Sequence, residues 1–296
     1  MDDIVTYYKA YLQSINKSQN TIKQYGIDTQ QFINFMKDHL FTFDDSIVKL
    51  IENYNLYLAE AFSSVASINR KKASLHHFLT FLRQRERINE LPDNLLKPIK
   101  KEKLTIHTLS TNQIKSVSNY WMEVFEATVG LDHKWIALRN FCIVNIMLEI
   151  GLKPSEVVNM KWGHMEENEI TIIHGKRIRK LFLSTANLIW LRVYRKQTEM
   201  LLPNSKEAEF VWLGLGNKQN EPITVKTIER IFQKLTDNLG FKVTATTLRY
   251  TLIDTDIKKE HGEQLEDLFA RYGYSRKSVL QERLDRIQKP PNLLKL

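Results

Sequence analysis

The residues of this sequence that could do chemistry are mostly cations gathered in short clusters. One cluster, on a predicted turn, comprises Lys176, Arg177, Arg179 and Lys180. Another, near a predicted helix start, comprises Asn69, Arg70, Lys71 and Lys72. Cations at a helix start interact unfavourably with the helix dipole, so we interpret the second cluster as one that contacts phosphate. Asn20 and Lys23, at an earlier helix start, receive the same interpretation, and a solvated face is the alternative for each group.

The overall charge favours a polyanionic partner. The 296-residue chain carries a net charge of +9 at pH 7, and most of the excess lies after residue 100. Such a balance is typical of proteins that bind nucleic acid or an anionic membrane. The longest apolar stretch, residues 141–152, contains Asn145 and Glu149 and is too short to span a bilayer. We therefore expect a nucleic-acid partner and no membrane partner.

The sequence predicts neither a metal site nor a cofactor. Its single cysteine, Cys142, lies in an apolar run, and no His-x₃-His pair occurs. Gly214 and Gly216 lack the following helix that a nucleotide-binding loop needs. One cysteine excludes an intrachain disulfide, and the first residues are acidic rather than apolar. We expect a cytoplasmic, nucleoid-associated protein.

Apolar periodicity predicts the elements that must position these cations. Four or so helices are expected over residues 1–91, with Ser18 and Ser67 as N-caps. Residues 92–106 contain two prolines and several lysines, which predicts an extended basic linker. We interpret the lysines as a strap along phosphates, with a solvated tether as the alternative. They are Lys97, Lys100, Lys101 and Lys103.

The rest of the chain, residues 107–296, predicts a second domain. Ser110 is expected to cap a helix that starts at Thr111, and Gly151 to end a buried helix. Pro154 fits the first turn of a short helix. The apolar runs 170–173 and 181–183 predict a β-hairpin. Further helices are expected near 185–200, 224–238, 248–258, 264–271 and 276–287.

The order of short motifs resembles that of tyrosine recombinases of the phage-integrase type. Residues 18–25 and 67–82 resemble parts of the family's helical core-binding domain, and residues 107–110 resemble the start of its catalytic domain. Four boxes follow in family order. Ile150–Val157 is similar to Thr-Gly-Leu-Arg-x-Ser-Glu-Leu, Gly175–Leu181 to the lysine hairpin, Thr246–Tyr250 to His-x-Leu-Arg-His, and Tyr272–Ser275 to Leu-Gly-His-Ser.

The resemblance implies a mainly α fold with a small β-hairpin or sheet. The helical, SAM-like core-binding domain would cover residues 1–91, the linker 92–106 and the catalytic-type domain 107–296. In the family, such a pair of domains closes as a C-shaped clamp around duplex DNA.

The departures from the family pattern are as informative as the matches. In the family, arginines, a lysine and histidine-type residues surround the scissile phosphate, which a tyrosine attacks. The corresponding positions here are Lys153, Lys176, Thr246, Arg249 and Tyr274, with Arg283 in place of the tyrosine. Lysine at 153 keeps the charge but loses the planar fork of arginine. Thr246 has no imidazole, and Arg283 stays protonated and cannot attack phosphorus. The pattern thus predicts phosphate binding without an intact catalytic set.

The resulting hypothesis is sequence-specific binding of double-stranded DNA without cleavage, as in a transcriptional repressor of a prophage or other mobile element. An active recombinase that uses a displaced Tyr272 or Tyr274 is the alternative, and an accessory subunit of a recombinase is a third. A leucine-rich tail at 290–296 is a candidate for self-association, as in the family, with folding back onto its own domain as the alternative. The sequence does not identify a protein or peptide regulator. The candidate DNA-binding residues are Asn20, Lys23, Asn69, Arg70, Lys71, Lys72, Lys100, Lys101, Lys103, Lys153, Lys176, Arg177, Arg179, Thr246 and Arg249.

Overall fold

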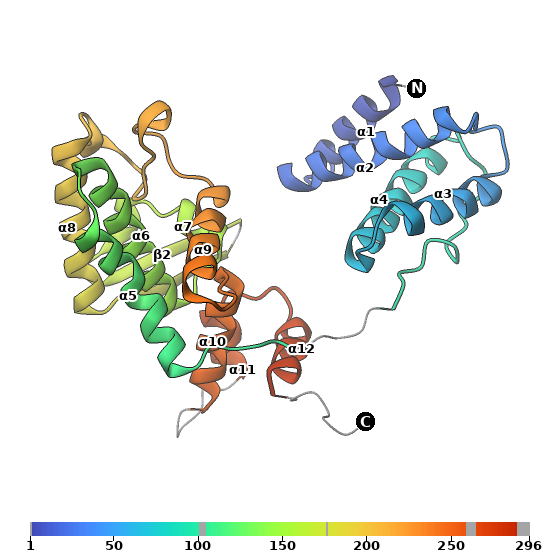
Figure 1. Ribbon diagram of the computed structural model, residues 1–296. Helices are drawn as coiled ribbons and strands as arrows, with labels where there is room; N and C mark the ends of the chain where they lie inside the picture. The colour runs from blue at the N-terminus through green and yellow to red at the C-terminus, as the bar shows by residue number, and fades with distance from the viewer. Residues whose placement is uncertain (1, 101–104, 176, 259–264, 289–296) are drawn as a thin grey trace. The chain divides into compact units, whose positions relative to one another are not determined.

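The chain folds into two compact units, residues 1–103 and 104–296. The computed structural model describes residues 2–100, 105–175, 177–258 and 265–288 (Figure 1). The predicted DNA contacts Lys101, Lys103 and Lys176 and the tail 290–296 lie outside the described residues. None of the described helices is long and apolar enough to cross a membrane.

Unit 1 is a bundle of helices around one aromatic core. It comprises α1 (Asp2–Ser14), α2 (Gln19–Asp38), α3 (Ile47–Ala61) and α4 (Val65–Arg83). The predicted cap at Ser18 is confirmed, since its side chain accepts a hydrogen bond from the Thr21 N–H at 3.2 Å. Tyr8, Phe32 and Phe78 are among the fully buried side chains that join α1, α2 and α4. Rings of this size supply much of the apolar area that a small domain can bury.

The cap predicted at Ser67 is wrong, because α4 begins three residues earlier. Ser64 is the N-cap, and its hydroxyl accepts a hydrogen bond from the Ser67 N–H at 3.5 Å. Both serines can cap, and the structure uses Ser64, so that residues 65–67 are already helical. The polar cluster at 69–72 therefore lies past the first turn of α4 instead of opening the helix.

The first half of the predicted linker folds back onto unit 1. The Leu95 carbonyl accepts a hydrogen bond from Asn55 at 3.0 Å, and Leu96 is buried in the core of the unit. Asn69 on α4 accepts from the Ile99 N–H and donates to the Ile99 carbonyl, both at 2.8 Å. Residues 92–99 are therefore held on the bundle rather than extended as a free tether. The predicted contacts Lys97 and Lys100 are exposed there.

Unit 2 is built around one buried helix, α6 (Leu131–Ile150), which packs against α5 (Thr111–Ala127) and α8 (Thr185–Leu201) (Figure 1). Ser110 caps α5 through a capping box, as predicted. Seven of the last ten residues of α6 are apolar and buried, which explains why its sequence shows little amphipathic pattern. Further elements are α7 (Pro154–Val158), α9 (Val225–Leu239), α10 (Ala245–Lys258), α11 (Leu265–Arg271) and α12 (Lys277–Gln288), with short 3₁₀ turns at Trp162–His164, Ser205–Glu207 and Gly216–Lys218.

A small antiparallel sheet of order β1-β2-β3 completes unit 2. Its strands are β1 (Met165–Glu166), β2 (Glu169–His174) and β3 (Arg177–Phe182). The predicted hairpin is confirmed, with Ile172 opposite Arg179 and Ile170 opposite Leu181. These four side chains share the inward face, while Lys180 lies on the opposite face because side chains alternate along a strand. The fold is mainly helical with a small sheet, as expected.

The end of α6 depends on a glycine. Gly151 adopts a left-handed conformation with φ of 62° and closes α6, as predicted. A Cβ atom at this position would also lie 2.6 Å from Cε1 of Tyr272. The backbone conformation and the close approach of α11 therefore both favour glycine at this position.

We predict that Gly151→Ala lowers the free energy of unfolding of unit 2 by at least about 1 kcal/mol, the lower bound for placing a side chain in the left-handed region. All five tryptophans lie after residue 104, so tryptophan fluorescence during denaturation reports on unit 2. Gly163→Ala is the matched control, because its added Cβ would meet no atom within 4 Å. Equal stability of the two variants would contradict this account.

Candidate functional site

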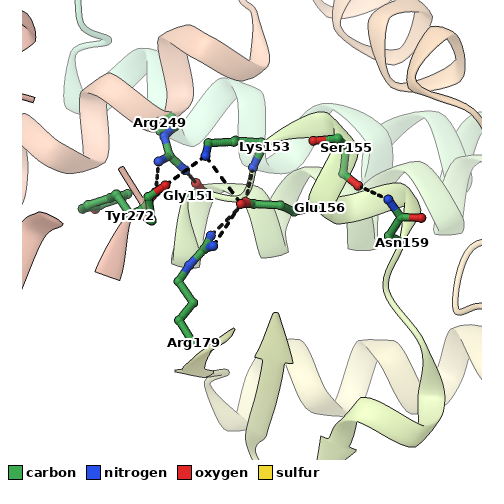
Figure 2. Close-up of polar contacts among 9 residues, drawn as sticks. Gly151, Lys153, Ser155, Glu156, Asn159, Arg179, Arg249 and Tyr272 are labelled. Atoms are coloured by element: carbon green, nitrogen blue, oxygen red, sulfur yellow. Dashed lines mark hydrogen bonds and ion pairs between the residues drawn. The ribbon is translucent and has the colours of Figure 1, made fainter. Parts of the chain in front are cut away.

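Three cations from separate parts of the chain lie close together in unit 2, and two of them, Lys153 and Arg179, pair with one buried carboxylate (Figure 2). Lys153 precedes α7, Arg179 lies on β3 and Arg249 lies on α10. The carboxylate is Glu156, on the first turn of α7. We call these four residues the cationic centre. Three of its members, Lys153, Arg179 and Arg249, are predicted DNA contacts, and the structure brings them together from positions up to about a hundred residues apart in the chain.

Arg249 is buried, with only 6% of its surface exposed, and its charge is held by backbone carbonyls. One terminal nitrogen donates to the Gly151 carbonyl at 2.6 Å, and the other donates to the Tyr272 carbonyl. The Cζ atom also lies 5.2 Å from the ring centroids of both Tyr272 and Tyr274. Arg249 thus connects the end of α6 to the residues that follow α11.

Glu156 is almost fully buried and is satisfied by hydrogen bonds on both oxygens. Arg179 donates to it in a bidentate pair at 2.9 and 2.8 Å, and the Lys153 N–H donates at 2.8 Å. Burial by itself would raise the pKa of this carboxyl. The hydrogen bonds and charge of Arg179, together with Lys153, outweigh burial and hold the pKa below its ordinary value. Glu156 is therefore ionised at neutral pH.

Lys153 is half-buried among like charges. Its ammonium donates to the Gly273 carbonyl at 3.1 Å and lies 3.8 Å from Glu156. Burial lowers the pKa of Lys153, the Glu156 charge opposes that shift, and Arg249, Arg179 and Arg177 reinforce it. With one carboxylate against three cations, the centre keeps a net positive charge, which an anion would stabilise.

The tyrosines near this centre differ in their environment. Tyr272 is fully buried, and its hydroxyl donates to the Asp256 carboxylate at 2.7 Å. Tyr274 is only half-buried and is hydrogen-bonded to Tyr250. Burial, then the neighbouring Tyr274, raise the pKa of Tyr250, while the Arg283 charge acts in the opposite direction. Arg283, at the position where the resemblance would place the nucleophile, therefore adds a further cation near Tyr250.

The remaining candidate residues of unit 2 lie in different surroundings. Thr246 is exposed on the first turn of α10 and lines a cavity of about 480 Å³ with residues of α9. Arg177 is exposed at the start of β3. Lys180 lies on the outer face of the sheet, where it pairs with Glu169 at 2.7 Å.

The predicted contacts of unit 1 divide into exposed and interior residues. Asn20 and Lys23 are exposed on the first turn of α2. Lys71 is buried, and its ammonium donates to Asp28 and Gln31, which does not fit the prediction of a DNA-facing side chain. Arg70 also bonds Asp28 but keeps an exposed edge.

Two other predicted contacts of α4 have partners within unit 1. Asn69 is engaged by Ile99 through both its amide atoms. Lys72 donates to the Leu95 carbonyl at 3.4 Å. A buried acid such as Asp28, which the residue pattern did not single out, explains why cations gather on α4 without requiring phosphate there.

No group of acidic, histidine or cysteine side chains suited to a metal ion occurs within the described residues.

The sequence interpretation missed the role of Glu156. A glutamate at the third position of a short helix that begins with the proline of Gly-x-x-Pro is nevertheless a detectable signal. What the centre offers chemically is fixed hydrogen-bond donors for an anion such as phosphate.

We predict that Glu156→Gln destabilises unit 2 by about 3 kcal/mol at pH 7, because it leaves buried cations without their counter-charge. A carboxyl with a lowered folded pKa stabilises the fold above its ordinary value of 4.5 and loses that effect as pH falls through the folded pKa. The difference from wild type should therefore shrink below about pH 4.5. The measurement is denaturation at several pH values, and a pH-independent difference would contradict the assignment.

The chain was compared with known proteins. The family model described as "Phage integrase family" matches residues 108–259, and "Phage integrase, N-terminal SAM-like domain" matches residues 5–86. Tyrosine recombinase XerC of Rickettsia canadensis (strain McKiel) is 23% identical over 298 residues, covering 95% of this chain and 91% of that protein. A tyrosine recombinase of Caldanaerobacter subterraneus subsp. tengcongensis is 30% identical over 144 residues, and that match covers 49% of this chain and 47% of the relative.

Solved structures show the same fold. The XerH site-specific recombinase bound to its palindromic difH substrate aligns with a TM-score of 0.70 at 14% identity, covering 95% of this chain and 82% of that one. A lambda integrase (75–356) dimer bound to a COC′ core site aligns with a TM-score of 0.65 at 14% identity, covering 94% and 96%. Because two family models match consecutive parts of the chain in the order of its two units, the chain belongs to the phage integrase family of tyrosine recombinases.

Proposed function

We propose that this protein binds double-stranded DNA site-specifically and that its cationic centre holds a backbone phosphate. The observation that carries the proposal is the cluster of three cations, in which Lys153 and Arg179 pair with Glu156 and Arg249 lies near enough to Lys153 to lower its pKa. A phosphate diester would neutralise the excess charge and accept the hydrogen bonds that these rigid donors offer.

The surfaces of both units support a duplex as the ligand. Asn20 and Lys23 on unit 1 and Arg177 on unit 2 are exposed polar or cationic residues that can contact phosphates without rearrangement. Two solved structures of the same fold are, by their titles, recombinases bound to DNA sites. We infer that both units of this chain contact the same duplex.

Two functions can follow binding, and specific observations favour each. Strand exchange in site-specific recombination is favoured by the relatives, whose names describe recombinases. For that function Tyr274 is the stronger nucleophile candidate, because it is half-buried beside Arg249, whereas the Tyr272 hydroxyl is buried against Asp256. The comparisons favour this function more directly than they favour a regulator.

Binding without cleavage, as in a repressor of a prophage or other mobile element, is favoured by local chemistry. The family position of the nucleophile holds Arg283, and the position of the first arginine holds Lys153. A protonated guanidinium does not replace a tyrosine hydroxyl as nucleophile, but it can add to the affinity for DNA.

A first experiment tests phosphate binding itself. We predict that Lys153→Gln weakens binding of a selected duplex roughly 10- to 150-fold, the range for one charge-assisted hydrogen bond. The loss should be similar for different sequence variants of the site, and the salt slope should fall by about one. Lys218→Gln is the control, since Lys218 is exposed and pairs with Glu221 outside the centre. Lys153→Gln and Lys218→Gln proteins with equal affinity would exclude phosphate binding at the centre.

Arg249→Ala is a poorer test of binding than Lys153→Gln. Its guanidinium joins the Gly151 and Tyr272 carbonyls, so its removal would also destabilise unit 2.

A second experiment separates the two functions. The protein is incubated with a nicked duplex that traps a covalent protein–DNA intermediate. We expect Tyr272→Phe to leave the amount of any trapped adduct unchanged, because that hydroxyl is buried and bonded to Asp256. An adduct lost only in Tyr274→Phe would assign strand exchange through Tyr274. Intact binding with no adduct would assign a regulator, and an adduct lost in Tyr272→Phe would contradict the structural assignment.

A further inference from the structure

The hairpin cations do not share one environment. Arg179 and Lys180 are neighbours on β3, and their side chains lie on opposite faces of the sheet. Lys180 is largely exposed and pairs with Glu169. The Arg179 side chain is 13% exposed and pairs with Glu156 inside the cationic centre. Of these two adjacent cations, only Arg179 belongs to the centre.

Arg179 has one donor left over. Its two terminal nitrogens each donate to Glu156, whereas its Nε atom is buried and has no hydrogen-bond partner in the described structure. A buried N–H without an acceptor is costly, about 1–3 kcal/mol for a typical group, and such groups often mark a place that a ligand completes. The unused donor therefore points to an acceptor that binds beside Arg179.

A cavity borders Arg179. It has a volume of about 400 Å³, and its lining includes His174, Arg177 and Arg179 from the hairpin with Gly273 and Tyr274 from the segment after α11. Gly273 makes room for the guanidinium, since a Cβ at this position would lie 2.6 Å from Nη1 of Arg179. Tyr274 also packs on Arg249, so one side chain borders both the cavity and the cationic centre.

We propose that Arg179 is a phosphate-binding residue, whose Nε–H donates to an oxygen of the DNA phosphate held at the cationic centre. Glu156 fixes the guanidinium by its terminal nitrogens and leaves the Nε edge for the ligand. Lys153 supplies charge from α7, and Arg179 supplies the planar donor that a lysine lacks. The inference rests on the proposed function, because it names the atom through which Arg179 would bind the same phosphate.

The test couples a protein variant to a single phosphate. A duplex selected by the wild-type protein from a random-sequence pool is prepared as a series, each member with one phosphate replaced by a neutral methylphosphonate. Wild type is compared with Arg179→Lys, which keeps a charge opposite Glu156 but lacks the Nε donor. The double variant Glu156→Gln/Arg179→Gln provides a neutral pair if the single variant fails to fold. Lys180→Gln is the matched control on the other face of β3.

We expect both Arg179 variants to bind the unmodified duplex at least about tenfold more weakly than wild type. The methylphosphonate penalty should shrink at one linkage, where Lys153 still contacts the phosphate, and stay unchanged elsewhere, a pattern that loss of folding would not produce. A penalty profile like that of wild type, or an affinity like that of Lys180→Gln, would overturn the inference and leave the proposed function standing. Failure of wild type to bind any duplex would overturn the proposed function and the inference with it.

Discussion

Unit 2 depends on one buried carboxylate. Glu156 accepts hydrogen bonds from α7's own N-terminus and from Arg179 on β3, so it joins a helix to the sheet. A buried ion pair is maintained only when its hydrogen bonds are complete, and removal of one partner costs more than the pair contributes. Arg249 performs the matching task for the backbone, because it joins the end of α6 to the residues after α11. These two anchors fix where the cations lie.

The same anchors explain why the centre suits binding. Each cation is already held by a carbonyl or a carboxylate, so little side-chain entropy is lost when an anion arrives. The centre has more positive than negative charge, but each cation already has a hydrogen-bond acceptor, which keeps the fold stable without a ligand. Tyr274, Tyr250 and Arg283 border the centre with two phenols and a cation. The cationic centre serves both proposed functions, and Tyr274 takes part as a nucleophile only in strand exchange.

Much of this could be predicted from local sequence. Ser18, Ser110, Gly151 and Pro154 marked helix ends correctly because capping is a local interaction. The local sequence did not show whether Ser64 or Ser67 caps α4, because serine favours the N-cap position at either site.

Long-range polar pairing could not be predicted. Lys71 and Asp28 are 43 positions apart, so a cation that looked suited to DNA is used inside unit 1. Motif order located Lys153 and Arg249, but only the folded chain shows Arg179 on Glu156 with its Nε unused.

The measurement that tests the central claim most directly is a structure of the protein on a selected duplex. The account predicts a backbone phosphate with oxygens within hydrogen-bond distance of the Lys153 ammonium and of Nε of Arg179, and with Glu156 still paired to Arg179. A complex in which DNA lies against other surfaces, while the Lys153 ammonium stays on the Gly273 carbonyl and no phosphate reaches the centre, would contradict it.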